Sequence, residues 1–340
     1  MTTRNLSLLK PTGRLTLGNL LGALQPMAAA QEQADCFYGV ADLHALTVPH
    51  DPRALRELST QMATLLLACG LDTSTLFVQS RVPAHSELAY LLECTATTGE
   101  LNRMIQFKEK GRGRDGTRAS LFTYPALMAA DILLYRPDRV PVGDDQRQHV
   151  ELTRDLAIRF NNTYGPVFTV PEIVTPSTAA RIMDLARPTE KMGKSHADGS
   201  GIVYLLDPPD VVRRKVARAV TDSDAGPDAV RRDRERKPGV TNLLDVLESC
   251  AGPGAADGLV TYGALKAAVT DAVVATLAPV QKRFAELAAD PGFVTETFER
   301  GERILDDVQW PCARQRSGVD KPPGTAMSSP LGIVARPRRT

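Results

Sequence analysis

The chain has 340 residues, 43% of them hydrophobic, which is enough for a large domain with a sizeable core and a smaller second domain. Its formal net charge of +1 excludes a global basic field, so no DNA partner is expected and any RNA contact must be local. We expect a soluble cytoplasmic protein without a disulfide framework, a metal site or a membrane partner. The five cysteines are widely spaced, no apolar signal segment opens the chain, and no run approaches the ~20 apolar residues of a membrane span.

Short apolar runs alternate with helical patterns over the first part of the chain. We expect strands at 6–9, 35–41 and 76–78 and helices at 20–30 and 55–69. This alternation predicts an α/β fold, a Rossmann-type parallel sheet with helices on both faces. Ligands of such sheets bind beyond the carboxyl ends of the strands, which is where residues 11–19 and 42–44 fall.

A basic, glycine-rich loop is expected after a helix end at 106–110. Residues 111–116 mix glycine with arginine and aspartate. The pattern allows two interpretations, a solvated run of charge or a loop that closes on polyphosphate. In the second interpretation Lys110 is the candidate contact.

One helical face carries a single carboxylate. Tyr124, Met128, Asp131 and Tyr135 recur at helical spacing, so Asp131 stands among apolar and aromatic groups. Because burying an unpaired carboxylate is costly, Asp131 needs a dedicated donor. The donor is either a partner within the fold or the N–H group of a ligand, with Met128 packed on a flat ring.

A strand at 140–142 ends at Gly143, and two acids, Asp144 and Asp145, then open a helix. Acids at a helix N-terminus are favoured by the helix dipole alone, so capping is one interpretation. The other is contact with ribose hydroxyls and with the amino group of a substrate. His149, inside this helix, is interpreted as structural.

The pattern becomes helical after about residue 200. A helix starts at 207–209, where proline is tolerated in the first turn, and a long charged loop follows at 222–239. Apolar residues over 264–277 predict an amphipathic helix that Pro279 stops. Prolines and arginines at 317–340 predict a flexible tail.

Two short motifs stand about 170 residues apart. The first, at 11–19, reads Pro-Thr-Gly-Arg-Leu-Thr-Leu-Gly-Asn and follows a predicted strand, the arrangement that cradles phosphate. The second, at 191–195, reads Lys-Met-Gly-Lys-Ser, and by itself it is equally a solvated loop. Together they resemble the two ATP signatures, HIGH and KMSKS, of class I aminoacyl-tRNA synthetases.

Further motifs resemble one family, bacterial tryptophanyl-tRNA synthetase. They are the stretches 41–47, 106–110, 124–135, 143–159, 220–223 and 237–244, and the likeness spans roughly 6–305. The resemblance implies activation of L-tryptophan by ATP to tryptophanyl-AMP and its transfer to the 3′-terminal adenosine of tRNA(Trp). It also implies a homodimer. The implied domains are a Rossmann catalytic domain (1–195), a helical anticodon-binding domain (196–285), a helical return to the catalytic domain (286–316) and the tail (317–340).

The same resemblance implies the site residues. Asp131 would accept the indole N–H of tryptophan, with Tyr124, Met128 and His44 around the ring and Gln146 nearby. ATP would lie on Lys10, Pro11, Thr12, Gly18, Asn19, Gly143, Asp144, Asp145, Ile182, Lys191, Met192, Gly193, Lys194 and Ser195. Mg²⁺ would accompany the triphosphate without a protein cage. The implied catalytic residues are Lys191, Lys194, Lys110, Thr16 and Asn19, with the lysines facing developing charge.

This chain departs from the family pattern at three positions. Lys10 stands where a neutral amide is common, Asp144 replaces a glutamate, and Gly193 replaces a serine. We expect the cation of Lys10 to favour tryptophan over a neutral mimic such as indolmycin, which would make this an auxiliary, analogue-resistant enzyme. Neutral drift is the alternative.

Two other functions are weighed against the tryptophan enzyme. A tyrosyl-tRNA synthetase shares the ATP signatures, but the stretches 129–135 and 42–47 resemble the tryptophan enzyme. A non-catalytic paralogue that binds tryptophan or RNA is the second alternative. The intact lysines of 191–195 and the presence of Asp131 argue against it.

Overall fold

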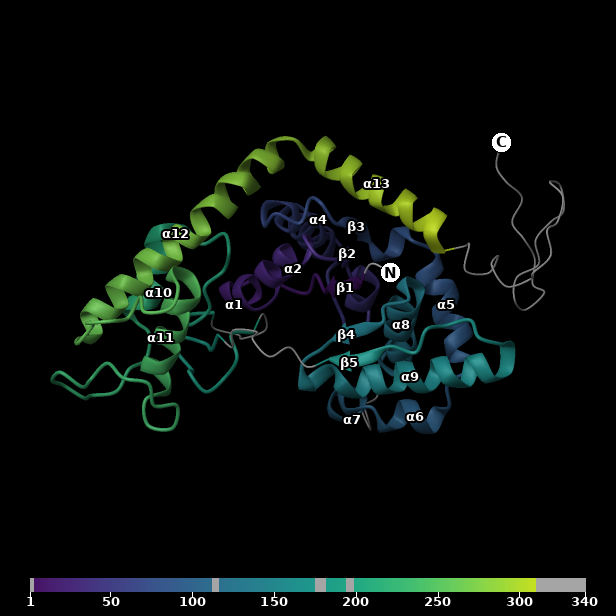
Figure 1. Ribbon diagram of the computed structural model, residues 1–340, viewed down its shortest axis with the longest axis horizontal. Helices are drawn as coiled ribbons and strands as arrows, with labels where there is room; N and C mark the ends of the chain where they lie inside the picture. The colour runs from purple at the N-terminus through teal and green to yellow at the C-terminus, as the bar shows by residue number, and fades with distance from the viewer. Residues whose placement is uncertain (1–2, 112–115, 175–181, 194–198, 310–340) are drawn as a thin grey trace.

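The computed structural model describes residues 3–111, 116–174, 182–193 and 199–309 (Figure 1). The expected tail at 317–340 lies outside them. Three strands pair in parallel in the order β1-β2-β3: β1 (Arg4–Leu9), β2 (Asp35–Val40) and β3 (Thr75–Val78). A second parallel pair joins β4 (Arg139–Pro141) to β5 (Glu172–Val174), and β4 lies next to β1. The predicted α/β fold with a parallel sheet is therefore confirmed.

Side chains of β2 alternate between two cores, as the period of a strand requires. Tyr38 packs with the helices on one face, where its hydroxyl donates to the carbonyl of Met27 at 2.9 Å. Phe37 points to the other face and packs with Tyr135 and Leu305. Leu76 and Phe77 of β3 divide between the same two cores, so side chains pack on both faces of the sheet.

Helices connect and cover the strands. After β1 come α1 (Leu17–Asn19), a π-helical turn η1 (Leu20–Leu24) and α2 (Gln25–Ala30), which together form the helix expected at 20–30. The other helices of this part are α3 (Asp42–Ala45), α4 (Pro52–Ala68), η2 (Gln79–Arg81), α5 (Ala84–Glu93), α6 (Thr98–Arg103), α7 (Ile105–Lys110), α8 (Ala119–Tyr135) and α9 (Asp144–Tyr164). The strand–glycine–helix order predicted at 140–145 is present in β4, Gly143 and α9.

Four helices follow: α10 (Pro209–Ala217), α11 (Pro238–Ala251), α12 (Tyr262–Ala289) and α13 (Pro291–Gln309). The predicted stop at Pro279 is wrong, because α12 runs through this proline to Ala289. The apolar stripe continues beyond it with Val280 and Leu287, both buried. Packing of such a stripe outweighs the backbone hydrogen bond that proline removes.

Among the described residues, α12 is the one helix whose length and composition would allow it to cross a membrane. Its mean hydropathy reaches 1.4 over 18 residues. Its buried residues pack against α4, α10 and α11, the arrangement of a core helix.

The charged loop expected at 222–239 is held by a cationic side chain. Lys237 is 2% exposed, and its Nζ lies 2.8 Å from Asp222 Oδ1, 2.7 Å from Asp224 Oδ2 and 2.9 Å from the hydroxyl of Tyr262. Burial opposes the charge of Lys237, but these hydrogen bonds outweigh it and raise its pKa. One cation thus joins the loop to α12.

The last two helices arch from the α10–α11 group back over the sheet (Figure 1). Gly301 of α13 lies so close to β3 that a Cβ there would be 1.9 Å from the carbonyl oxygen of Leu76. Glu302 accepts a hydrogen bond from the backbone N–H of Val78 at 3.2 Å. The edge strand β3 is therefore covered by the helix α13. The domain limits expected from the sequence stay predictions.

Candidate functional site

The carboxyl ends of β1 and β2 bring Lys10 and His44 together. Nζ of Lys10 donates to Oγ1 of Thr47 at 3.1 Å, and Thr47 donates to the carbonyl of His44 at 2.8 Å. Lys10 is half-buried beside the short helix α3. The departure at position 10 therefore places a cation next to the residues predicted to surround tryptophan.

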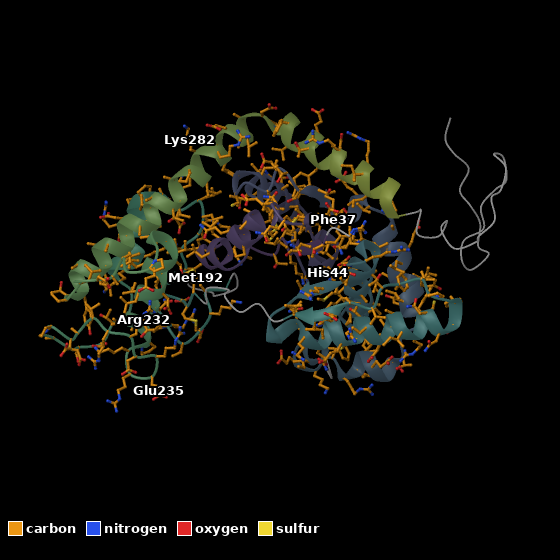
Figure 2. All side chains as sticks on the ribbon, viewed as in Figure 1. Phe37, His44, Met192, Arg232, Glu235 and Lys282 are labelled. Atoms are coloured by element: carbon orange, nitrogen blue, oxygen red, sulfur yellow. The ribbon has the colours of Figure 1, made fainter. Side chains whose placement is uncertain are left out.

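The two ATP signatures meet in space. A Cβ on Gly18 would lie 3.5 Å from Cβ of Met192, so the second motif packs directly on the first. The N–H of Met192 donates to the carbonyl of Ile182 at 3.0 Å, and Lys191 pairs with Met183 as an isolated bridge. Figure 2 shows Met192 on the side of the helices α10, α11 and α12, and His44 on the side of α8. Lys194 and Ser195 lie outside the described residues.

Thr16 and Asn19 form hydrogen bonds with each other. The N–H of Asn19 donates to Oγ1 of Thr16 at 3.3 Å, and the N–H of Thr16 donates to Oδ1 of Asn19 at 3.0 Å. This capping box fixes the start of α1. Thr16 is fully buried, so its predicted catalytic role would act through the position of Asn19, and it stays a prediction.

The first signature is tied to the chain that follows the second. The N–H of Leu17 donates to Val203 at 2.8 Å, and the N–H of Leu205 donates to Leu15 at 3.0 Å. Beside them, the guanidinium of Arg14 lies 4.3 Å from the ring centroid of Tyr204. Backbone hydrogen bonds and a cation–π contact therefore join the predicted phosphate cradle to residues 203–205.

Asp131 has three donors within the fold. Its Oδ1 accepts from Nε2 of Gln79 at 2.7 Å and lies 2.6 Å from Nδ1 of His85, and its Oδ2 lies 2.7 Å from Nε2 of His44. Burial raises the pKa of Asp131, but the charges of His44 and His85 and their hydrogen bonds outweigh it and lower the pKa from 3.8 to about 2. The expected dedicated donor is therefore present, and contact with a ligand stays a prediction.

The histidine that bonds this carboxylate also contacts an aromatic ring. Tyr124 meets His44 edge to face at 6.2 Å between centroids, and its hydroxyl bonds Nε2 of His149. Met128 is half-buried and packs beside the β4 residue Val140. Of the five residues predicted for tryptophan, His44, Tyr124 and Asp131 are thus in one cluster.

Several other predicted residues lie at helix ends. Gly143 is the N-cap of α9, Asp144 and Asp145 are its first residues, and Gln146 donates its N–H to the carbonyl of Gly143 at 3.0 Å. Lys110 is the last residue of α7. In the described part of the chain, no group of three His, Cys, Asp or Glu side chains is placed to hold a metal ion.

A cavity of about 240 Å³ opens between α3, α5 and α8, beside this cluster. Its lining includes Thr47, which holds Lys10, and Tyr124, which packs on His44. The other lining residues are Leu43, Ser86, Ala89, Tyr90, Glu93, Ser120, Thr123 and Leu127.

Sequence reasoning missed Gln79 and His85. Both are fully buried, and both donate to Asp131. Gln79 directly follows β3, at the same edge of the sheet as the loops after β1 and β2, and His85 lies in the first turn of the next helix, α5. A polar residue and a histidine just after a predicted strand were the signal available in the sequence.

A sequence profile of the family described as tRNA synthetases class I (W and Y) matches residues 3–278. The chain is 56% identical over 309 residues to tryptophan–tRNA ligase 1 of Streptomyces coelicolor, covering 88% of this chain and 91% of that protein. It is 47% identical to tryptophan–tRNA ligase of Caldanaerobacter subterraneus subsp. tengcongensis, covering 87% and 92%.

The fold is also similar to solved structures of tryptophanyl-tRNA synthetases. Tryptophanyl-tRNA synthetase from Mycoplasma pneumoniae superposes with a TM-score of 0.80 at 37% identity, covering 91% of this chain and 95% of that chain. The enzyme from Campylobacter jejuni, solved in complex with ADP and tryptophan, superposes with a TM-score of 0.79 at 28% identity, covering 92% and 98%.

Proposed function

The chain belongs to the class I tRNA synthetases of the tryptophan and tyrosine group, and we propose on this basis that it is a tryptophan–tRNA ligase. It activates L-tryptophan with ATP, forming tryptophanyl-AMP and pyrophosphate, and transfers the amino acid to the 3′-terminal adenosine of tRNA(Trp). The observation that carries the proposal is the ionised Asp131 beside Tyr124 and His44. The tyrosyl alternative is not favoured, because the relatives of high identity are tryptophan enzymes.

Asp131 selects tryptophan by accepting its indole N–H. Tyr124, Met128 and His44 surround the ring, and Gln146 lies near the amino acid. Phenylalanine has no N–H to offer, so its binding would leave a buried carboxylate oxygen without that partner. Such a loss supports discrimination without an editing domain.

ATP lies across the two signatures and the start of α9. The contact of Gly18 with Met192 supports this assignment, since it forms one surface from both motifs. The residues assigned to ATP are Lys10, Pro11, Thr12, Gly18, Asn19, Gly143, Asp144, Asp145, Ile182 and 191–195. Mg²⁺ arrives with the triphosphate, which supplies its oxygen ligands.

The reaction needs positioning and charge stabilisation. The carboxylate of tryptophan attacks the α-phosphorus in line, and pyrophosphate leaves. No general base is required, because the carboxylate is already ionised. Lys191, Lys194 and Lys110 neutralise charge that develops on the phosphates. Asn19, held by Thr16, contributes at the start of α1.

Translation in the cytoplasm is the proposed setting, with the enzyme acting as a homodimer. The helical part at 196–285 binds the anticodon of tRNA(Trp). Its backbone link to the first signature, through Leu17 and Val203, supports communication between the two regions.

Tryptophan-dependent ATP–pyrophosphate exchange tests the function. We expect exchange with tryptophan and little with tyrosine at equal concentration. Exchange with tyrosine alone would assign the tyrosyl activity. Binding of tryptophan without exchange would assign the non-catalytic paralogue.

Lys10 is expected to weaken the binding of neutral tryptophan mimics. Its cation is held by Thr47, whose hydroxyl bonds the carbonyl of His44, so it lies at the edge of the proposed pocket. Lys10→Gln should lower the inhibition constant of indolmycin by about tenfold, the effect of about 1.4 kcal/mol. The tryptophan KM should change much less.

Inhibition of tryptophan-dependent exchange measures this effect. Lys282→Gln, on the exposed surface of α12, is the matched control for loss of one lysine charge. Equal inhibition constants for Lys10→Gln and the parent would show that the cation at position 10 has no role in analogue resistance.

A further inference from the structure

The donors of Asp131 are distributed unequally between its two oxygens. Oδ1 accepts from Gln79 and His85, which fills the two acceptor positions of a carboxylate oxygen. Oδ2 is approached by His44, which leaves it one further position. The side chain of His44 is 13% exposed, whereas that of His85 is 0% exposed. An N–H group of a ligand can therefore reach the carboxylate only at Oδ2, on the side of His44.

The ring of His85 is held by hydrogen bonds at both nitrogens and by one stacked aromatic ring. Nδ1 faces Oδ1 of Asp131, and Nε2 lies 2.9 Å from the hydroxyl of Tyr135. Because an ionised carboxylate only accepts hydrogen bonds, Nδ1 carries a proton and donates to Asp131, while Nε2 is hydrogen-bonded to the hydroxyl of Tyr135. Phe77 stacks on the same ring at 5.5 Å with an interplanar angle of 18°. Tyr135, His85 and Asp131 thus form one chain of hydrogen bonds.

Gln79 also restrains the orientation of the Asp131 carboxylate. Its Nε2 donates to Oδ1 of Asp131, and its buried Oε1 has no hydrogen-bond partner in the described residues. A flipped amide would set Oε1 against the carboxylate oxygen, which is repulsive. The fold thus leaves one buried carbonyl oxygen unpaired and keeps the donation to Asp131.

We propose that His85, oriented by Tyr135, and Gln79 are specificity-determining positioning residues that hold Oδ1 of Asp131 and so present Oδ2 to the indole N–H of tryptophan. None of the three needs to touch the substrate. This inference rests on the proposed function and names residues that act in it through Asp131.

A purely structural role predicts a different result from a positioning role. If the network only stabilises the fold, its loss lowers the unfolding temperature and affects all amino acids alike. If it positions Asp131, its loss acts on tryptophan more than on β-(benzothiophen-3-yl)alanine, in which sulfur replaces the indole N–H. The informative quantity is the ratio of kcat/KM for tryptophan to kcat/KM for this analogue.

The experiment measures this ratio by ATP–pyrophosphate exchange for the full chain and its variants. His85→Phe keeps the stacking on Phe77 but removes both ring nitrogens, and we expect the ratio to fall about tenfold, the loss of one well-placed hydrogen bond. His85→Asn restores an amide donor near the position of Nδ1 and should keep the ratio within about threefold of the parent. His50→Phe, outside the cluster, is the control and should leave the ratio unchanged.

The outcomes separate the inference from the function. No activation of tryptophan by the parent enzyme would overturn the proposed function. An active parent whose ratio is unchanged in His85→Phe would overturn the positioning role alone. If His85→Phe does not fold, Tyr135→Phe and Gln79→Met replace it, since each removes one hydrogen bond of the network. A lower ratio in either variant supports the proposal, and an unchanged ratio in both contradicts it.

Discussion

Replacing Asp131 with asparagine is expected to lower kcat/KM for tryptophan by about ten-thousandfold, the lower end of the range in which a buried polar site rejects a mismatched partner. Three donors, from Gln79, His85 and His44, converge on the two oxygens of Asp131. An asparagine offers one oxygen and one NH₂ group, so an N–H would face another donor either at Oδ1 or at the position of the indole. Both arrangements bury an unsatisfied group.

Steady-state exchange kinetics measure this loss, and the KM for ATP should be nearly unchanged. Asp271→Asn, on the exposed side of α12, controls for the loss of one negative charge. A kcat/KM for tryptophan within threefold of the parent would remove Asp131 from substrate selection.

Asp131→Asn is also expected to change how the unfolding temperature depends on pH in acid. Asp131 has its pKa lowered from 3.8 to about 2 in the folded chain, although burial alone would raise it. The folded state is therefore stabilised by the ionised group above pH 3.8, and this contribution is lost as the pH falls toward 2. Between these values, the unfolding temperature of Asp131→Asn should depend less on pH than that of the parent.

Sequence patterns predicted the local features of the site better than its connections. The strands, the turn at 11–19 and the single carboxylate on the face of α8 followed from period and composition. The partners of Asp131 did not, since His85 and Gln79 are 46 and 52 residues away and meet it only when η2 and α5 pack beside α8. Pairings at such separations depend on topology, which local patterns do not encode.

Pro279 illustrates the opposite error. Proline is a reliable local signal for a helix end, and the prediction used it so. The structure continues α12 because Val280 and Leu287 extend the buried stripe past the proline. Tertiary packing therefore decided the length of this helix against its local preference.

The packing of α13 on β3 is expected to be very sensitive to one methyl group. Gly301→Ala would place its Cβ 1.9 Å from the carbonyl oxygen of Leu76 and 3.1 Å from the same residue's N. Both are backbone atoms of β3, so no side-chain rotation can relieve the overlap. We expect the free energy of unfolding to fall by about 3 kcal/mol, the upper end of common overpacking penalties.

Gly301→Ala should also disturb the proposed tryptophan pocket around Asp131. Gln79 directly follows β3, and it donates to Asp131. Displacement of β3 by α13 would therefore move one of the donors that fix this carboxylate. We expect Gly301→Ala to show both a lower unfolding temperature and a lower kcat/KM for tryptophan.

Gly263→Ala, in the preceding helix α12, is the matched control. A Cβ at Gly263 would meet no atom within 4 Å, and the residue lies in the first turn of α12. Alanine there should leave stability unchanged or raise it by up to about 1 kcal/mol, because glycine is the poorer helix former. Thermal unfolding of the two variants at equal protein concentration makes the comparison. Equal midpoints for Gly301→Ala and Gly263→Ala would mean that α13 does not press on β3, and the coupling between the C-terminal helix and the pocket would then have no physical basis.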